Sequence, residues 1–148
     1  LAVSGLAFAL FYIQTGLDIA SNGSQGMLYI TALGILGLAV GTVGVGLLAS
    51  LAWLMTRPFG GDQPVGWAVR AFGLAYAPAA IYAVFGLGAN LLLDWHTALA
   101  FGVTGVLWAL GPMIVAIRQM TDQRTGVSVL VATVCGALML GLWAVIVR

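Results

Sequence analysis

Residues 27–56 read MLYITALGILGLAVGTVGVGLLASLAWLMT and contain no charged residue. A helix of about 20 apolar residues crosses the hydrocarbon core of a bilayer, so this stretch can span a membrane with length to spare for tilting. Four glycines spaced by three, four and three residues lie on one face of that helix: Gly34, Gly37, Gly41 and Gly44. A glycine weakens a helix by about 1 kcal/mol relative to alanine, but a bare face lets a neighbouring membrane helix pack closely. We therefore predict a central transmembrane helix with a glycine seam against which the other helices pack; the alternative is a glycine-rich helix that faces lipid.

Composition supports a membrane protein. Of the 148 residues, 62% are hydrophobic and 6% are charged, whereas soluble domains have about 25% charged residues. The net charge of +1 and the absence of a basic patch argue against a nucleic-acid partner. All basic residues are Arg and all acidic residues are Asp, in a chain rich in Gly and Ala. This bias favours a bacterium with a GC-rich genome, and therefore a place in the bacterial inner membrane.

Four more apolar stretches bring the number of predicted spans to five. The fold expected is an all-α bundle in a single domain, 1–148, with transmembrane helices at 1–17, 27–56, 66–93, 97–117 and 127–147. We expect Pro78 to kink the third helix, and residues 18–25, DIASNGSQ, to form a polar loop. Since Leu1 already lies in apolar sequence, we also expect the true start of the protein to precede it.

The fourth span repeats the small-residue pattern of the second. Its small or helix-bending residues are spaced by three, four, three and four: Gly102, Gly105, Ala109, Pro112 and Ala116. Such spacing again gives one helix face without large side chains. We therefore expect the second and fourth spans to present these faces to each other.

Arginines predict the orientation in the membrane. Arg57, Arg118 and Arg124 lie in loops that share a side with the N-terminus, and Arg70 lies just inside the start of the third span. The opposite side has only Arg148. Cytoplasmic loops carry an excess of Lys and Arg, so the N-terminus is predicted to be cytoplasmic and the C-terminus external.

The four cytoplasmic-side arginines are also candidate contact residues. Arg70 either extends its side chain to the interface or binds a lipid phosphate or an acidic group of a partner. Asp62 and Asp122 lie on the same side and could pair with Arg70 or with Arg118.

The sequence offers little for catalysis, and we expect neither an enzyme nor a bound metal or cofactor. His96 is the single histidine, whereas a haem or a histidine-based metal site needs more ligands. It could titrate together with Asp94, two residues away, or simply lie at the level of the lipid headgroups. Cys135 has no base within its helix, which indicates a packing residue. Trp108 is in mid-span and is expected to be a packing residue and not part of a ligand-binding wall, whereas the other tryptophans are expected to anchor at the interfaces: Trp53, Trp67, Trp95 and Trp143.

From about residue 48 onward the chain resembles the Yip family of polytopic membrane proteins, named for interaction with small Ypt/Rab GTPases in eukaryotes. The likeness covers about two thirds of the chain and is carried by LLASLAWLMTRPFGGDQPVGWAVRAFGLAYAPAAIYAVFG, with Gly60-Gly61, Tyr76 and Pro78, and by GVTGVLWALGPMIVAIRQMTDQRTGVSVLVATV, with Trp108. The resemblance implies a helical membrane scaffold without catalysis and, in eukaryotes, roles in vesicle trafficking and membrane shaping. Eukaryotic members carry an acidic and aromatic N-terminal segment, which these residues do not contain.

The sequence therefore favours a non-catalytic membrane scaffold or accessory subunit that acts through helix contacts with partner subunits. The alternative is a small transporter or channel subunit that forms a pore by oligomerisation. That alternative requires a polar stripe along one water-filled path, for which the candidates are Gln14, Thr42, Asn90 and Thr104. The oligomeric state cannot be inferred from the sequence.

Overall fold

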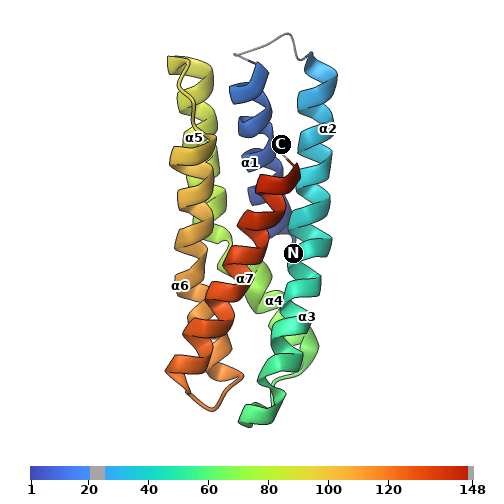
Figure 1. The fold of residues 1–148 in the computed structure, drawn as a ribbon, viewed down its shortest axis with the longest axis vertical. Coiled ribbons are helices and arrows are strands. Elements are labelled where there is room, and N and C mark those ends of the chain that lie inside the picture. Colours follow the sequence, from blue (N-terminus) through green and yellow to red (C-terminus); the bar gives the residue numbers. More distant parts are fainter. Residues whose placement is uncertain (21–25, 147–148) are drawn as a thin grey trace.

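The computed structural model describes residues 1–20 and 26–146, and these residues form helices and short connections without a strand (Figure 1). In chain order the elements are α1 (Ala2–Ala20), α2 (Met27–Ala39), the π-helix η1 (Val40–Gly44), α3 (Val45–Thr56), the 3₁₀-helix η2 (Arg57–Phe59), α4 (Val65–Ala75), α5 (Ala77–Leu93), the π-helix η3 (Ala98–Val103), α6 (Thr104–Gln119) and α7 (Thr125–Ile146).

These elements combine into five helical stretches that are long and apolar enough to cross a membrane: Ala2–Ala20, Met27–Phe59, Val65–Leu93, Ala98–Gln119 and Thr125–Ile146. The all-α, five-span fold class is thereby confirmed. The predicted boundaries differ by a few residues, and the difference matters at one place. Asp18 lies inside α1 and not in a loop. Ile19 and Ala20 of the predicted polar loop also lie in α1, whereas residues 21–25 and Arg148 lie outside the described residues.

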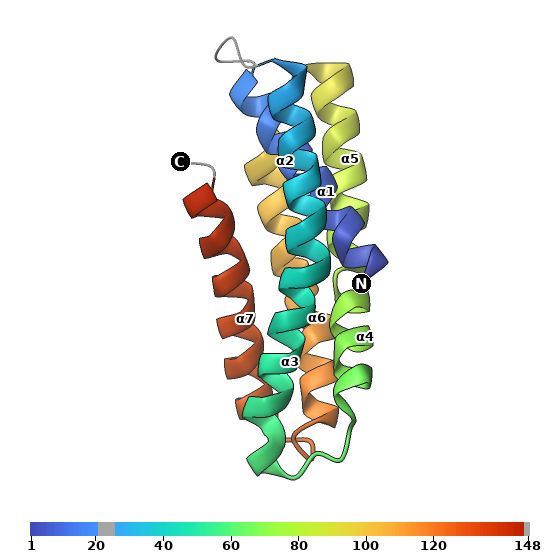
Figure 2. The same cartoon turned by 90° about the vertical axis from the view of Figure 1, so that its right-hand side faces the viewer.

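The most deeply packed helix is α1, and the prediction that residues 27–56 form the centre of the bundle is wrong. Half of the spanning window of α1 is buried (50%), compared with 33% for Met27–Phe59. Helix α1 lies between α2 and α5 and begins at about half the height of the bundle (Figures 1 and 2). Its buried face carries large rings, Phe8, Phe11 and Tyr12. A helix with bulky side chains therefore forms the core, and glycine-bearing helices pack against it.

The glycine seam meets α1. A Cβ atom on Gly37 would fall on the backbone carbonyl of Phe8, and one on Gly41 would fall on that of Ser4. A Cβ on Gly34 would lie 3.0 Å from Cγ1 of Ile13. Gly44 differs, since its nearest neighbour would be Cγ1 of Val40 in its own helix, at 3.7 Å. The backbones of α1 and of the α2–η1 segment thus approach so closely that only glycine fits at Gly37 and Gly41.

The small face of the fourth span has a different partner from the one expected. A Cβ on Gly102 would fall on the ring of Phe11 in α1, and one on Gly105 would lie 3.0 Å from Cα of Ala79 in α5. Ala109 is fully buried. This face therefore packs against α1 and α5, and the expectation that it faces the glycine seam is wrong. The two small faces do not meet because the aromatic side chains of α1 fill the space between them.

The third span is interrupted where Pro78 predicts a kink. Tyr76 separates α4 from α5 with a φ of −84° and a ψ of 7°, outside the helical region. Pro78 lies in the first turn of α5, where its missing N–H costs no intrahelical hydrogen bond. The predicted kink is confirmed.

Candidate functional site

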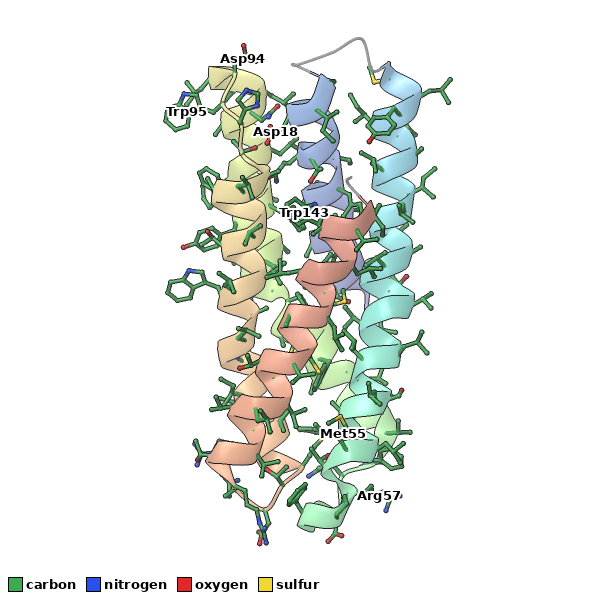
Figure 3. The ribbon with its side chains drawn as sticks, viewed as in Figure 1. Asp18, Met55, Arg57, Asp94, Trp95 and Trp143 are labelled. Atoms are coloured by element: carbon green, nitrogen blue, oxygen red, sulfur yellow. The ribbon has the colours of Figure 1, made fainter. Side chains whose placement is uncertain are left out.

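A cluster of polar residues lies at one end of the bundle around Asp18, which Figure 3 shows near Asp94 and Trp95 and far from Arg57. The Asp18 carboxylate accepts hydrogen bonds from Nδ2 of Asn90 (2.7 Å) and from the backbone N–H groups of Thr97 (3.2 Å) and Ala98 (2.8 Å). Nδ1 of His96 lies 3.8 Å from the same carboxylate. The side chain of Asp18 is only 15% exposed. One carboxylate of α1 thus binds the end of α5 and the start of η3 together.

This arrangement follows from the needs of a helix start. The first N–H groups of a helix have no intrahelical acceptor, and an acceptor with negative charge is especially favourable there. No side chain near the start of η3 caps it locally, so Asp18 supplies the oxygens from a different helix. The preceding turn begins at Asp94, whose φ of 53° lies in the left-handed region and ends α5.

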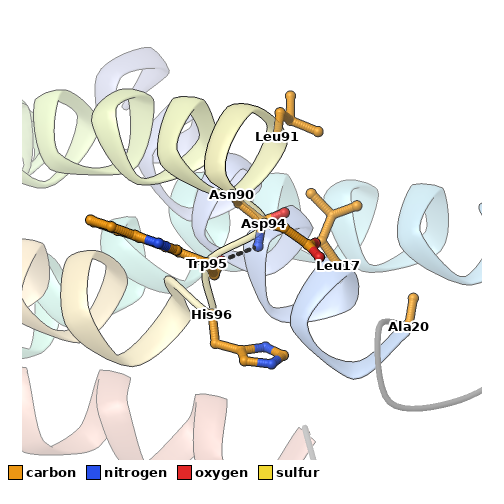
Figure 4. Close-up of a pocket in the computed structure, with 7 residues that line it drawn as sticks. All are labelled: Leu17, Ala20, Asn90, Leu91, Asp94, Trp95 and His96. Atoms are coloured by element: carbon orange, nitrogen blue, oxygen red, sulfur yellow. Dashed lines mark hydrogen bonds between the residues drawn. The ribbon is translucent and has the colours of Figure 1, made fainter.

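The pairing of His96 with Asp94, one of the two possibilities considered, is not found, because the carboxylate that His96 approaches is that of Asp18. Figure 4 shows Asn90 behind the 94–96 turn, where its Nδ2 also donates to the carbonyl of Trp95 (2.9 Å). A pocket of about 440 Å³ opens beside this turn, lined by Leu17, Ala20, Asn90, Leu91, Asp94, Trp95 and His96.

Two more polar contacts attach α1 to other helices. One turn before Asp18, Nε2 of Gln14 donates to the carbonyl of Ala83 in α5 at 2.5 Å. On another face of α1, the indole Nε1 of Trp143 in α7 donates to Oγ1 of Thr15 at 3.1 Å. The Trp143 ring also stacks on Phe11 with a centroid distance of 5.1 Å.

We expect replacement of Trp143 to separate its ring contact from its hydrogen bond. Trp143→Phe keeps an aromatic ring against Phe11 and should reduce the free energy of unfolding by less than about 1 kcal/mol, the usual worth of a hydrogen bond between membrane helices. Trp143→Ala also removes the ring and should cost about 3 kcal/mol. Unfolding in mixed micelles with increasing SDS would measure both, and equal costs would show that the ring contact contributes nothing.

The other tryptophans differ in environment. Trp53 donates to the carbonyl of Gln63 (2.7 Å), and Trp95 is exposed at the Asp18 end of the bundle. Trp108 is 59% exposed, so the packing expected of it is found on the outside of the bundle. It lies on the outer surface of α6, where its ring stacks on Tyr82 of α5 at a centroid distance of 6.2 Å.

The opposite end carries the arginines. Arg57 lies over the ring of Trp53 (4.3 Å), and Arg124 lies over that of Phe59 (5.6 Å). Arg70 is exposed, whereas Arg118 is half-buried and its Nε makes no hydrogen bond. Within residues 1–20 and 26–146 these arginines form no ion pair with Asp62 or Asp122. Arg57 and Arg124 therefore pack on aromatic rings, and the pairing considered for Asp62 or Asp122 with Arg70 or Arg118 is not found among these residues.

An apolar groove runs along the outside of the bundle between α3 and α7. Its volume is about 550 Å³, and its lining is Gly44, Leu47, Leu48, Ala137, Leu138, Met139, Gly141, Leu142 and Val145. The groove forms because α7 leans away from α2 toward its C-terminal end (Figure 2). Gly44 of the glycine seam therefore opens onto this groove and not onto α1.

The four residues proposed as a polar stripe lie in different environments. Gln14 is buried against α5, Asn90 is held in the Asp18 cluster, and Thr42 donates to the carbonyl of Leu38 in its own helix (2.8 Å). Thr104 begins α6 and is half-buried. No pocket found among the described residues is lined by these four together.

In the part of the chain that the structure describes, no three His, Cys, Asp or Glu side chains are placed to hold a metal ion. Cys135 is buried in α7 as a free thiol. The residue that the sequence analysis missed is Asp18, which was assigned to a loop. Its spacing of four from Gln14 was the available signal, because it places both polar side chains on one face of a helix.

Comparison with known proteins adds no relative to this description. No family model, no curated protein and no solved structure matches the chain. The resemblance to the Yip family therefore rests on the quoted residues alone.

Proposed function

We propose that this chain is a non-catalytic membrane scaffold or accessory subunit that acts through helix contacts in a larger assembly. The observation that carries the proposal is the use of polar groups that reach from one span to another. Asp18, Gln14 and Trp143 each bind a different helix or helix start, so these groups hold the bundle in a fixed shape. A rigid bundle suits a protein whose function is to present surfaces.

The surface that best fits a partner is the α3–α7 groove. The interior glycines Gly37 and Gly41 are already covered by α1 and offer nothing to another protein. The groove instead has small residues, Gly44, Ala137 and Gly141, between exposed leucines. Small residues let the backbone of a neighbouring membrane helix approach closely, so we assign the groove to a transmembrane helix of a partner subunit.

The orientation belongs to the same proposal. Arg57, Arg118 and Arg124 lie at the end of the bundle opposite Asp18 (Figures 1 and 3). The excess of arginine in cytoplasmic loops supports a cytoplasmic position for that end in a bacterial inner membrane. A pore-forming subunit remains the alternative, but the separate environments of Gln14, Thr42 and Asn90 give it no polar stripe in one chain.

Site-directed photocrosslinking tests the groove. In a Cys135→Ala background, a photoreactive group attached at Leu138→Cys would lie in the groove, and one at Leu130→Cys would lie on α7 outside it. We expect the Leu138 probe, in native membranes, to capture a membrane protein that mass spectrometry identifies, and the Leu130 probe to capture lipid. Capture of lipid alone from both positions would contradict the proposed groove.

A further inference from the structure

The outer face of α5 and α6 carries two polar aromatic groups in the middle of the membrane layer. Trp108 lies at the centre of the span Ala98–Gln119, about 15 Å from either end at a rise of about 1.5 Å per residue. Its ring stacks on Tyr82 of the neighbouring helix with an interplanar angle of 20°. The two groups therefore share nearly the same depth. Tryptophan normally concentrates at the membrane interfaces, so a mid-depth, outward-facing Trp108 needs a reason.

The polar atoms of the two rings have no partner among residues 1–20 and 26–146. The indole N–H of Trp108 and the hydroxyl of Tyr82 make no hydrogen bond to any described residue, in contrast to Trp53 and Trp143, whose N–H groups both have acceptors. Hydrocarbon offers no acceptor either, and an unpaired polar group there costs free energy. A neighbouring molecule that supplied the missing partners would therefore stabilise the pair where it lies.

The hydrogen-bonding groups of Trp108 and Tyr82 are complementary to those of a second copy of the chain. An indole N–H only donates, whereas a phenol oxygen also accepts. Two copies inserted with the same orientation and related by a two-fold axis along the membrane normal keep each residue at its own depth. Because Trp108 and Tyr82 are at one depth, Trp108 of each copy can then donate to Tyr82 of the other, and both bonds form together.

The surface next to the pair permits such an approach. Gly111 follows Trp108 by three residues on the same helix face and has open space around it. Its bare backbone leaves room for a neighbouring helix beside the two rings.

We propose that the Trp108–Tyr82 face is a homodimer interface, in which a second copy of this chain supplies the hydrogen-bond partners that the lipid cannot. This extends the proposed function, since a scaffold that pairs with itself can present two α3–α7 grooves at once. The dimer interface and the α3–α7 groove lie on different faces of the bundle, so either proposal can fail without the other.

The test is energy transfer between full-length chains in phosphatidylcholine vesicles over a range of protein-to-lipid ratios. Donor and acceptor dyes would be attached to Gln119→Cys in a Cys135→Ala background. We expect self-association, and we expect Trp108→Phe or Tyr82→Phe to weaken it about tenfold, the effect of losing two modest hydrogen bonds between membrane helices. The double variant should associate no more weakly than either single variant, because all three lose the same two bonds.

Matched controls separate this face from the rest of the surface. Trp95→Phe, at an indole that is 57% exposed but lies at the end of the bundle, should leave association unchanged. Gly111→Leu should abolish association, whereas Gly141→Leu, at an equally open glycine in the α3–α7 groove, should not. Absence of self-association, independent effects of the two Phe variants, or normal association of Gly111→Leu would each overturn the dimer, and capture of a different protein at this face without self-association would overturn it as well.

Discussion

Replacing Gly41 with alanine is expected to destabilise the bundle by about 3 kcal/mol, the upper part of the range for overpacking a tightly packed site. The added Cβ would coincide with the carbonyl of Ser4 and lie 2.8 Å from Cα of Gly5. Both atoms belong to the backbone of α1, so no side chain can rotate away and the helix itself must move. Unfolding of the variant in mixed micelles with increasing SDS measures the loss.

Two further variants make this prediction specific. Gly44→Ala changes a residue of the same glycine seam, but its Cβ would meet only Val40 at 3.7 Å, an ordinary contact. It should therefore be neutral or gain up to about 1 kcal/mol from helix propensity. The double variant Gly37→Ala/Gly41→Ala should cost less than the sum of its parts, because a displacement of α1 relieves both clashes. Equal effects of Gly41→Ala and Gly44→Ala would show that the close contact of α1 with η1 is wrong.

The second large effect is expected at Asp18. Asp18→Ala leaves the N–H groups of Thr97 and Ala98 and the amide of Asn90 without their acceptor. Unsatisfied donors and lost hydrogen bonds to a charged group each cost about 1–3 kcal/mol, so we expect a loss of about 3 kcal/mol in the free energy of unfolding. Hydrogen exchange of the N–H groups at the start of η3 should increase with it.

The conservative variant sharpens the test. Asp18→Asn keeps one acceptor oxygen but turns an amide toward groups that donate, so about 2 kcal/mol should be lost. Asp94→Asn is the matched control, because Asp94 is exposed and asparagine tolerates its left-handed φ of 53°. A measurable loss for Asp94→Asn together with none for Asp18→Asn would reverse the roles assigned to the two aspartates.

Hydrophobicity along the chain was enough to predict the five spans, and the position of Pro78 was enough to predict the break between α4 and α5. The length of an apolar stretch and the missing N–H of proline are local properties, so no knowledge of neighbours was needed. The glycine spacing likewise predicted a face for close packing. It could not identify the partner, because a bare face accepts any helix with suitable side chains, and the large rings of Phe8 and Tyr12 made α1 that partner.

The functional features depended on contacts between distant residues and were harder to predict. In the sequence, Asp18 looks like the first residue of a polar loop. Its role becomes visible only in the fold, where η3, about 80 residues later in the chain, begins beside α1. Trp108 was expected to be a packing residue because it lies in mid-span, but its position in the sequence does not say on which face of the bundle it packs. The depth of a residue in the membrane does not determine which face of its helix it lies on. The buried face of α6 is formed by Gly105 and Ala109, so Trp108 lies on the outer face.

The central claim, that the glycine seam packs on α1 and not on the fourth span, is tested most directly by disulfide formation in the membrane. In a Cys135→Ala background, Ile13→Cys/Gly34→Cys should form a disulfide on mild oxidation, since a Cβ on Gly34 would lie 3.0 Å from Cγ1 of Ile13. Gly34→Cys/Gly105→Cys, which joins the two small faces at equal distance from the starts of their spans, should remain reduced. A disulfide in the second pair and none in the first would contradict the packing of α1 described above.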